Sequence, residues 1–333
     1  MEKFSFLGDV YLNKEYQADS IIDGPFFFNL EAPISNKKND PYPNKINLCI
    51  DNVNYIKNTF GKYPYGVNLA NNHIFDYGMS AFLDTLNSLN ENNIKFCGFN
   101  NLSTNQTQKI SFRFSNNNVI IILGYCCSTT NPSNKVDTLS IINEKKVIND
   151  IKAIKENNLN NFVVINLHYG KEEIKLPSPN DVILSRKFID SGADLIIGHH
   201  AHVVQSYESY KGKKIYFGLG NCIFPDFELP SYFKNGISLK MSKKNNRLVN
   251  NYSLMVTVDE NLKVNHEWLF FDGKKLFKTT KYLLFFNFIT TSKSLFNFYI
   301  IISEKKRMIL NFLKNPKKIS YKRIKYFLKI NNL

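Results

Sequence analysis

Histidine side chains gather in three short segments of this 333-residue chain. Five of the six histidines lie in them, and these are His73, His168, His199, His200 and His202. Each segment directly follows a short apolar run of the kind that forms a buried strand, at residues 65–69, 162–165 and 195–197. Imidazoles are therefore expected at the carboxyl ends of strands, together on one rim of a sheet.

Two acidic residues occupy equivalent places. Asp9 ends one apolar run and Glu31 ends another. A loop that reads His-x-His can direct two neutral imidazoles at one ion, and carboxylates add the charge that holds a divalent metal. The candidate constellation is Asp9, Glu31, Asn72, His73, His168, His200 and His202.

Mixed nitrogen and oxygen ligands suit Mn, Fe or Zn better than Ca, which prefers oxygen alone. One or two such ions could polarise a phosphoryl or carbonyl oxygen and make hydroxide from bound water near neutral pH. Each residue taken alone also has a structural interpretation: Asp9 could cap a turn beside Gly8, and Asn72-His73 could begin a helix. The joint placement of the histidines at strand ends favours the metal site.

The remaining reactive residue types predict less chemistry. The five cysteines form no metal-binding spacing and are expected to be free thiols. His266 lies in a late strand region and is expected to be structural. No glycine-rich phosphate loop of the P-loop or dinucleotide type occurs in the sequence.

Alternating strand and helix patterns must position these residues. Apolar β-rich runs predict strands at 4–7, 26–29, 119–123, 162–166 and 195–197. Apolar residues at helical spacing predict helices at 51–60, 79–92, 143–157 and 179–191. Such alternation indicates an α/β fold. Consecutive strands are expected later, at 203–210, 214–219, 251–258 and 263–271, as a second sheet or an antiparallel extension.

Charge is unevenly distributed along the chain. Its 43 Lys and Arg exceed 28 Asp and Glu, and the net charge is +15. Residues 274–333 contain 15 Lys or Arg and the single acid Glu304, so a nearly neutral body carries a strongly basic tail. A hydrophobic content of 43% excludes wholesale disorder. Since the sequence has no secretory-signal pattern and no long uncharged apolar run, a cytoplasmic protein is expected.

The basic tail alternates Lys and Arg with apolar and aromatic residues. Two short amphipathic helices are expected between 304 and 330, separated near Asn315-Pro316, and they would lie flat on an anionic membrane surface. A peripheral position on the inner face of the plasma membrane is the resulting expectation. Packing of these helices on the body is one alternative. Nucleic-acid binding is another, which the near-neutral body disfavours.

Six motifs occur in order between about residues 3 and 225. They read Gly8-Asp9-Val10, Asn29-Leu30-Glu31-Ala32-Pro33, Ala70-Asn71-Asn72-His73-Ile74-Phe75-Asp76-Tyr77-Gly78, His168-Tyr169-Gly170-Lys171-Glu172, 192–202 with its Gly198-His199-His200-Ala201-His202 end, and Gly218-Leu219-Gly220-Asn221. This ordered set resembles the CapA family of capsule or poly-gamma-glutamate synthesis proteins. CapA proteins look like metallophosphoesterases of the calcineurin type. The resemblance implies a two-sheet α/β sandwich flanked by helices. We expect this domain at 1–273, and the charge distribution sets the basic helical tail at 274–333 apart from it.

The same resemblance implies roles for individual residues. Asp9 and His202 would hold one metal, Glu31 would bridge, and a second set would hold the other metal, namely Asn72, His168 and His200. His73 would be the general acid or a donor to the transition state. Glu172 and Asn221 would contribute from the rim by binding substrate.

One position departs from the superfamily pattern. The first superfamily motif reads Asp-x-His, whereas Tyr11 stands in the third place here. This leaves open a single metal, a weaker second site or a different hydrolytic substrate. The expected function is a metal-dependent, phosphoesterase-like hydrolase acting in capsule or surface-polymer biosynthesis. The alternative is a non-catalytic accessory protein of polysaccharide or poly-gamma-glutamate assembly, recruited to the membrane by its basic tail.

Overall fold

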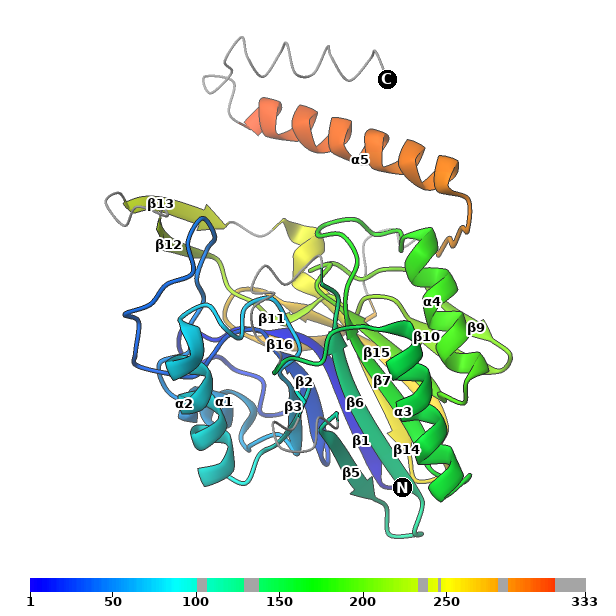
Figure 1. Ribbon diagram of the computed structural model, residues 1–333. Coiled ribbons are helices and arrows are strands. Elements are labelled where there is room, and N and C mark those ends of the chain that lie inside the picture. The colour runs from blue at the N-terminus through cyan, green and yellow to red at the C-terminus, as the bar shows by residue number, and fades with distance from the viewer. Residues whose placement is uncertain (101–106, 129–137, 233–238, 245–246, 281–286, 315–333) are drawn as a thin grey trace.

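The computed structural model describes residues 1–100, 107–128, 138–232, 239–244, 247–280 and 287–314. Two β-sheets stack face to face at its centre, and helices cover their outer faces (Figure 1). The α/β two-sheet sandwich flanked by helices that the sequence predicts is therefore confirmed.

The first sheet has eight strands in the order β16-β15-β14-β1-β2-β3-β4, with β11 also paired to β1. Its parallel part consists of β1 (Lys3–Val10), β2 (Phe26–Leu30), β3 (Gly66–Asn68), β4 (Lys95–Cys97) and β11 (Asn221–Ile223). Its antiparallel extension consists of β14 (Tyr252–Asp259), β15 (Val264–Phe271) and β16 (Leu276–Thr279). Because β16 begins at Leu276 and pairs with β15, the first sheet continues past the predicted domain boundary at 273.

The second sheet has the order β5-β6-β7-β8-β10-β9. Its strands are β5 (Lys109–Arg113), β6 (Val119–Cys126), β7 (Phe162–His168), β8 (Leu195–His199), β9 (Tyr207–Tyr210) and β10 (Lys213–Tyr216). β6, β7, β8 and β10 run parallel to their neighbours in that series. A separate antiparallel hairpin, β12 (Phe227–Tyr232) and β13 (Leu239–Lys244), projects from the sandwich (Figure 1).

Strand alternation explains the layers. In β6, Ile120 and Ile122 point into the core between the sheets, whereas Ile121 and Leu123 pack under the outer helices. This two-residue period makes each sheet apolar on both faces. The outer face of the first sheet is covered by α1 (Asn54–Phe60) and α2 (Gly78–Glu91), and that of the second by α3 (Glu144–Asn157) and α4 (Pro179–Asp190).

Local sequence signals set the helix boundaries. The Asn143 side chain accepts a hydrogen bond from the N–H of Lys146 at the start of α3. Ser178 caps α4 in the same way, and Pro179 follows in the first turn, where a missing N–H costs nothing. Gly61 ends α1 in the left-handed conformation.

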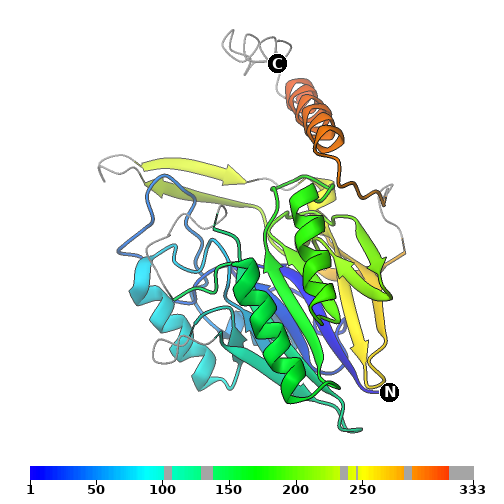
Figure 2. The ribbon, with the colours of Figure 1, turned by 45° about the vertical axis from the view of Figure 1, so that its right-hand side comes forward.

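A short 3-10 helix (Leu248–Asn251) and a long helix, α5 (Lys293–Lys314), complete the structure. α5 lies beyond the carboxyl ends of the parallel strands, as the two views agree (Figures 1 and 2). α5 overlaps the first of the two helices expected between 304 and 330 but begins earlier, at Lys293, and the second expected helix falls on 315–333, outside the described residues. None of the helices in the described part of the chain has the length and apolar character needed to cross a bilayer.

Candidate metal centre

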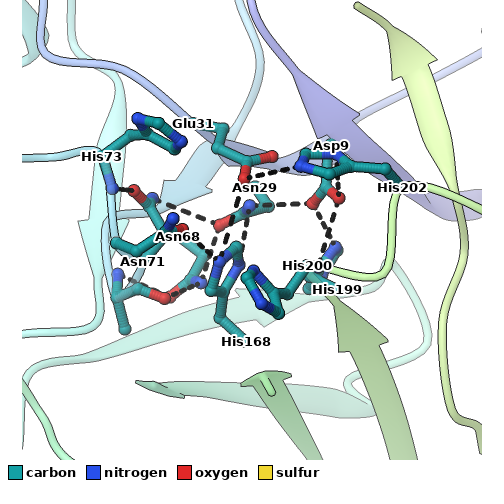
Figure 3. Close-up of polar contacts among 12 residues, drawn as sticks. Asp9, Asn29, Glu31, Asn68, Asn71, His73, His168, His199, His200 and His202 are labelled. Atoms are coloured by element: carbon teal, nitrogen blue, oxygen red, sulfur yellow. Dashed lines mark hydrogen bonds and ion pairs between the residues drawn. The ribbon is translucent and has the colours of Figure 1, made fainter. Parts of the chain in front are cut away.

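The carboxyl ends of strands from both sheets meet at one edge of the sandwich, and most of the predicted ligands gather there (Figure 3). Asp9 lies near the end of β1, Glu31 directly follows β2, and His168 ends β7. His200 and His202 occupy the loop after β8. All five residues are buried, with at most 6% of each exposed.

Close packing of β11 against β1 fixes Asp9. A Cβ at Gly8 would lie 1.9 Å from the carbonyl oxygen of Gly220, so only glycine permits this approach. The Asp9 N–H donates to that same carbonyl over 3.0 Å. The Gly8-Asp9 pair in the sequence is thereby explained: the glycine admits β11, and the carboxylate enters the centre.

The loop after β8 is strained. His200 and His202 have φ angles of +80° and +55°, in the left-handed region that non-glycine residues rarely adopt. The N–H of His200 donates to Asp9 Oδ2 over 3.2 Å, and Asn250 Nδ2 donates to the carbonyl of His202 over 3.0 Å. Strain of this kind, about 1–3 kcal/mol per residue, is typical of sites where side-chain aim matters.

The acidic and imidazole groups form two sets that share Glu31. One contains Asp9, Glu31 and His202, and the other contains Glu31, His168 and His200; within each set the ligand atoms lie within 4.8 Å of one another. Glu31 Oε1 is 3.6 Å from His202 Nε2 and 3.8 Å from His168 Nε2. These separations are too long for hydrogen bonds but suit neighbouring ligands of an ion held at about 2.0–2.2 Å.

Glu31 provides the test of whether these residues fit a metal. The residue is fully buried, and within the described part of the chain neither carboxylate oxygen has a hydrogen-bond partner. Burial, together with the charge of Asp9, raises the pKa of Glu31 well above its ordinary value. Buried carboxylates without partners are rare because desolvation is costly, and a divalent cation between the two sets would compensate both acids. The donor set therefore fits a metal centre.

The imidazoles are suited to the same task. Burial lowers the pKa of His168 well below its ordinary value, and burial also lowers the pKa values of His200 and His202. All three rings are therefore neutral near pH 7, which is the form that binds metal. Asn221 Oδ1 lies 2.8 Å from His202 Nδ1 and so holds the ring with Nε2 toward Glu31.

Two asparagines that were not predicted as site residues, Asn29 and Asn68, hold the ligands in place through hydrogen bonds. Asn29 Nδ2 donates to Asp9 Oδ1 over 2.8 Å and lies 3.3 Å from His168 Nδ1, so this amide links both ligand sets. Asn68 Nδ2 donates to Asn29 Oδ1 over 3.0 Å. The available signal was a polar residue inside a buried apolar strand, since Asn29 interrupts Phe26–Leu30.

Asn72 and His73 lie on the loop after β3, beside the second set. Asn72 Oδ1 lies 2.7 Å from His168 Nε2, which is a hydrogen-bond distance, so the amide reaches the same ring nitrogen that faces Glu31. His73 Nδ1 lies 2.5 Å from Asp76 Oδ2, and Lys45 Nζ lies 2.5 Å from the other oxygen of Asp76. Asp76 thus fixes the ring of His73 and leaves Nε2 free. Burial lowers the pKa of His73, and Asp76 partly opposes this.

The two residues predicted on the rim lie in different places. Glu172 is exposed on the loop after β7, and its charge acts on His73, His200 and His202. Asn221 is only 2% exposed. It lies beneath His202 rather than on the rim, because β11 is pinned in the sheet beside β1.

Tyr11 replaces an imidazole with an aromatic packing contact. Its ring is 2% exposed and lies 5.4 Å from the ring of Phe224, so it belongs to the core.

His199 was not predicted as a ligand, but it contacts the carboxylate of Asp9. Its Nδ1 lies 3.2 Å from Asp9 Oδ1. Although burial alone would raise the pKa of Asp9, contact with His199 holds it below its ordinary value.

Comparison with known proteins places this site in a family. The family described as bacterial capsule synthesis protein PGA_cap matches residues 23–226, which include every predicted site residue except Asp9. The chain belongs to the PGA_cap family. The resemblance to CapA proteins seen in the sequence is thereby confirmed.

Curated relatives agree. The capsule biosynthesis protein CapA of Bacillus anthracis is 32% identical over 164 residues, covering 47% of this chain and 39% of that protein. The PGA biosynthesis protein CapA of Bacillus subtilis is 30% identical over 238 residues, covering 66% and 62%. A probable polyglutamine synthesis accessory protein of Mycobacterium tuberculosis is 23% identical over 178 residues, covering 50% and 46%. The chain thus matches between 39% and 62% of the length of these relatives.

Proposed function

We propose that this PGA_cap protein is a divalent-metal-dependent hydrolase that cleaves a phosphoester or related bond during synthesis or export of a bacterial capsule or other surface polymer. The observation that carries the proposal is Glu31, a buried carboxylate without hydrogen-bond partners that lies between two histidine-containing sets. Asp9, Glu31 and His202 would hold one Mn, Fe or Zn ion. Asn72, His168 and His200 would hold a second with Glu31.

The bound metal would polarise the scissile group and generate hydroxide near neutral pH. His73 has the position of a proton donor to the leaving group. The Asp76 carboxylate accepts a hydrogen bond from Nδ1 of the His73 ring, so Nε2 of that ring is the atom that can carry a proton to the substrate. The ring is 12% exposed, which gives it access to a bound ligand while it stays oriented.

A non-catalytic accessory role is the second candidate. The absence of an imidazole at position 11 favours it, because the set around Asp9 then depends on His202 and the shared Glu31. One relative is itself described as a probable accessory protein. The two candidates differ in metal content and turnover.

The exposed face of α5 supports a location on an anionic membrane surface at the inner face of the plasma membrane. Leu295 is 54% exposed, Phe298 is 62% exposed and Ile302 is 48% exposed, and these positions share one face of the helix. Lys293 and Lys306 are exposed on the same helix. An apolar face flanked by lysines is typical of helices that lie in the bilayer interface.

Elemental analysis of the purified full chain tests the proposal, with a His168→Ala/His200→Ala variant for comparison. We expect one or two equivalents of Mn, Fe or Zn in the wild type, lost in the variant, and metal-dependent hydrolysis of a generic phosphodiester. A chain that binds metal without turnover would support the accessory role. Absence of metal after loading would overturn the hydrolase.

A further inference from the structure

Two lysines near the centre, Lys45 and Lys244, lie on segments that contact each other. The loop between β2 and α1 is fastened to the β12–β13 hairpin: the N–H of Asn44 donates to the carbonyl of Tyr232 over 2.7 Å, and Ile46 pairs with Ser231. Lys45 lies between these two contacts. Lys244 ends the hairpin.

Lys45 contacts the loop that lies beside the second ligand set. Its Nζ donates to the carbonyl of Asn72 and forms an ion pair with Asp76, and its side chain is only 16% exposed. Its charge acts on Glu31 and on His73. These are the two polar contacts of its Nζ among the described residues, and an ammonium group can donate three hydrogen bonds.

Lys244 lies beside the first set. Its Nζ is 4.7 Å from the centre of the Phe224 ring, and that ring is 4.9 Å from the ring of His202. Its charge acts on Glu31, His200 and His202. Among the described residues, no carboxylate lies within ion-pair distance of its Nζ.

The ion pair with Asp76 compensates much of the charge of Lys45, whereas the ammonium group of Lys244 would repel a nearby divalent metal unless an anion lies between the two cations. We propose that Lys45 and Lys244 form a cationic subsite that binds an anionic oxygen group of the substrate, a phosphate or a carboxylate, next to the scissile bond. This inference rests on the proposed function and adds which chemical group of the substrate the hydrolase would recognise. Lys244, whose charge acts on Glu172 but which forms no ion pair among the described residues, is the main anchor, and Lys45 also positions Asp76.

Calorimetric titration of the full chain tests the subsite, with inorganic phosphate and glutarate as probes. Each is titrated into metal-free and Mn²⁺-loaded protein, and metal content is measured on the same samples. Lys244→Ala should weaken binding of the preferred anion about 10- to 100-fold, as expected for loss of a hydrogen bond to a charged group. Lys152→Ala, on the exposed face of α3, is the matched control and should leave binding unchanged.

The outcomes separate the subsite from the metal centre. Tighter binding of phosphate would support a phosphate as the recognised group, and tighter binding of glutarate would support a carboxylate. Equal anion affinity in Lys244→Ala and wild type, at unchanged metal content, would overturn the subsite and leave the hydrolase intact. Failure of both probes to bind wild type at millimolar concentration would also overturn it. Loss of metal binding alone would count against the proposed function instead.

Discussion

Oε1 of Glu31 lies 3.6 Å from Nε2 of His202, and no hydrogen bond joins them. Both residues are buried, and the carboxylate has no hydrogen-bond partner among the described residues. A cation between the two side chains would accept the lone pair of the neutral imidazole and compensate the charge of the carboxylate. Glu31 is therefore the residue on which the centre most depends.

Glu31→Gln should abolish metal binding while it keeps the fold. Glutamine has the same shape but no charge, so the two sets lose their shared ligand. We expect metal added to the wild type to raise its melting temperature and to leave that of Glu31→Gln unchanged. Thermal unfolding with and without Mn²⁺, with metal content measured in parallel, checks this. A metal-induced rise of equal size in both proteins would contradict the bridging role.

Asn29→Ala should lower the stability of the protein and weaken metal binding, because it removes a hydrogen bond to a ligand. The amide donates to Asp9 over 2.8 Å, and its removal leaves a buried carboxylate short of one donor. We expect a loss of about 1–3 kcal/mol in the free energy of unfolding, measured with urea, and about 10- to 100-fold weaker metal binding. Asn87→Ala, on the exposed face of α2, is the control and should change neither quantity. Unaltered metal affinity in Asn29→Ala would show that Asp9 needs no such support.

The sequence predicts the architecture well because strands and helices depend on local signals, and the same signals place the candidate ligands at strand ends. Apolar runs with a period of two or 3.6 locate β6, β7 and α3, and strand ends locate His168 and Asp9. The supporting contacts need the tertiary structure. Asn29 meets His168, 139 positions away, only because the two sheets stack.

Asn221, predicted on the rim of the site, is buried for a reason that also lies in the tertiary structure. Asn221 follows a glycine-rich turn, which suggests an exposed loop, but β11 pairs with β1 and buries it. The short strands β4, β11 and β12 were not predicted either. Three to six residues carry too little periodicity to be distinguished from loops, and their neighbours in the sheets determine their conformation.

Asp76→Asn should reduce turnover without loss of metal. An amide still fills the space next to His73, but it no longer stabilises the protonated ring that donates to the leaving group. We expect kcat to fall about 10²- to 10⁴-fold for a poor leaving group, and much less for a nitrophenolate, which departs without a proton. A rate series over leaving-group pKa, together with metal content, checks this. An equal loss for all leaving groups would assign Asp76 to folding of the loop instead.

Leu295→Ser and Phe298→Ser should each detach the protein from anionic vesicles. Both side chains are more than half exposed on α5, and burial of such a side chain in the interface contributes about 1.5–3 kcal/mol. We expect each substitution to weaken binding to phosphatidylserine-containing vesicles about tenfold or more in a flotation assay. Asn297→Ser, which is exposed on the same helix, should have no effect. Salt should weaken binding of all these proteins, because the lysines act through long-range charge. If the two apolar substitutions left vesicle binding intact, or if an oligonucleotide competed for the same protein, the membrane proposal would fail.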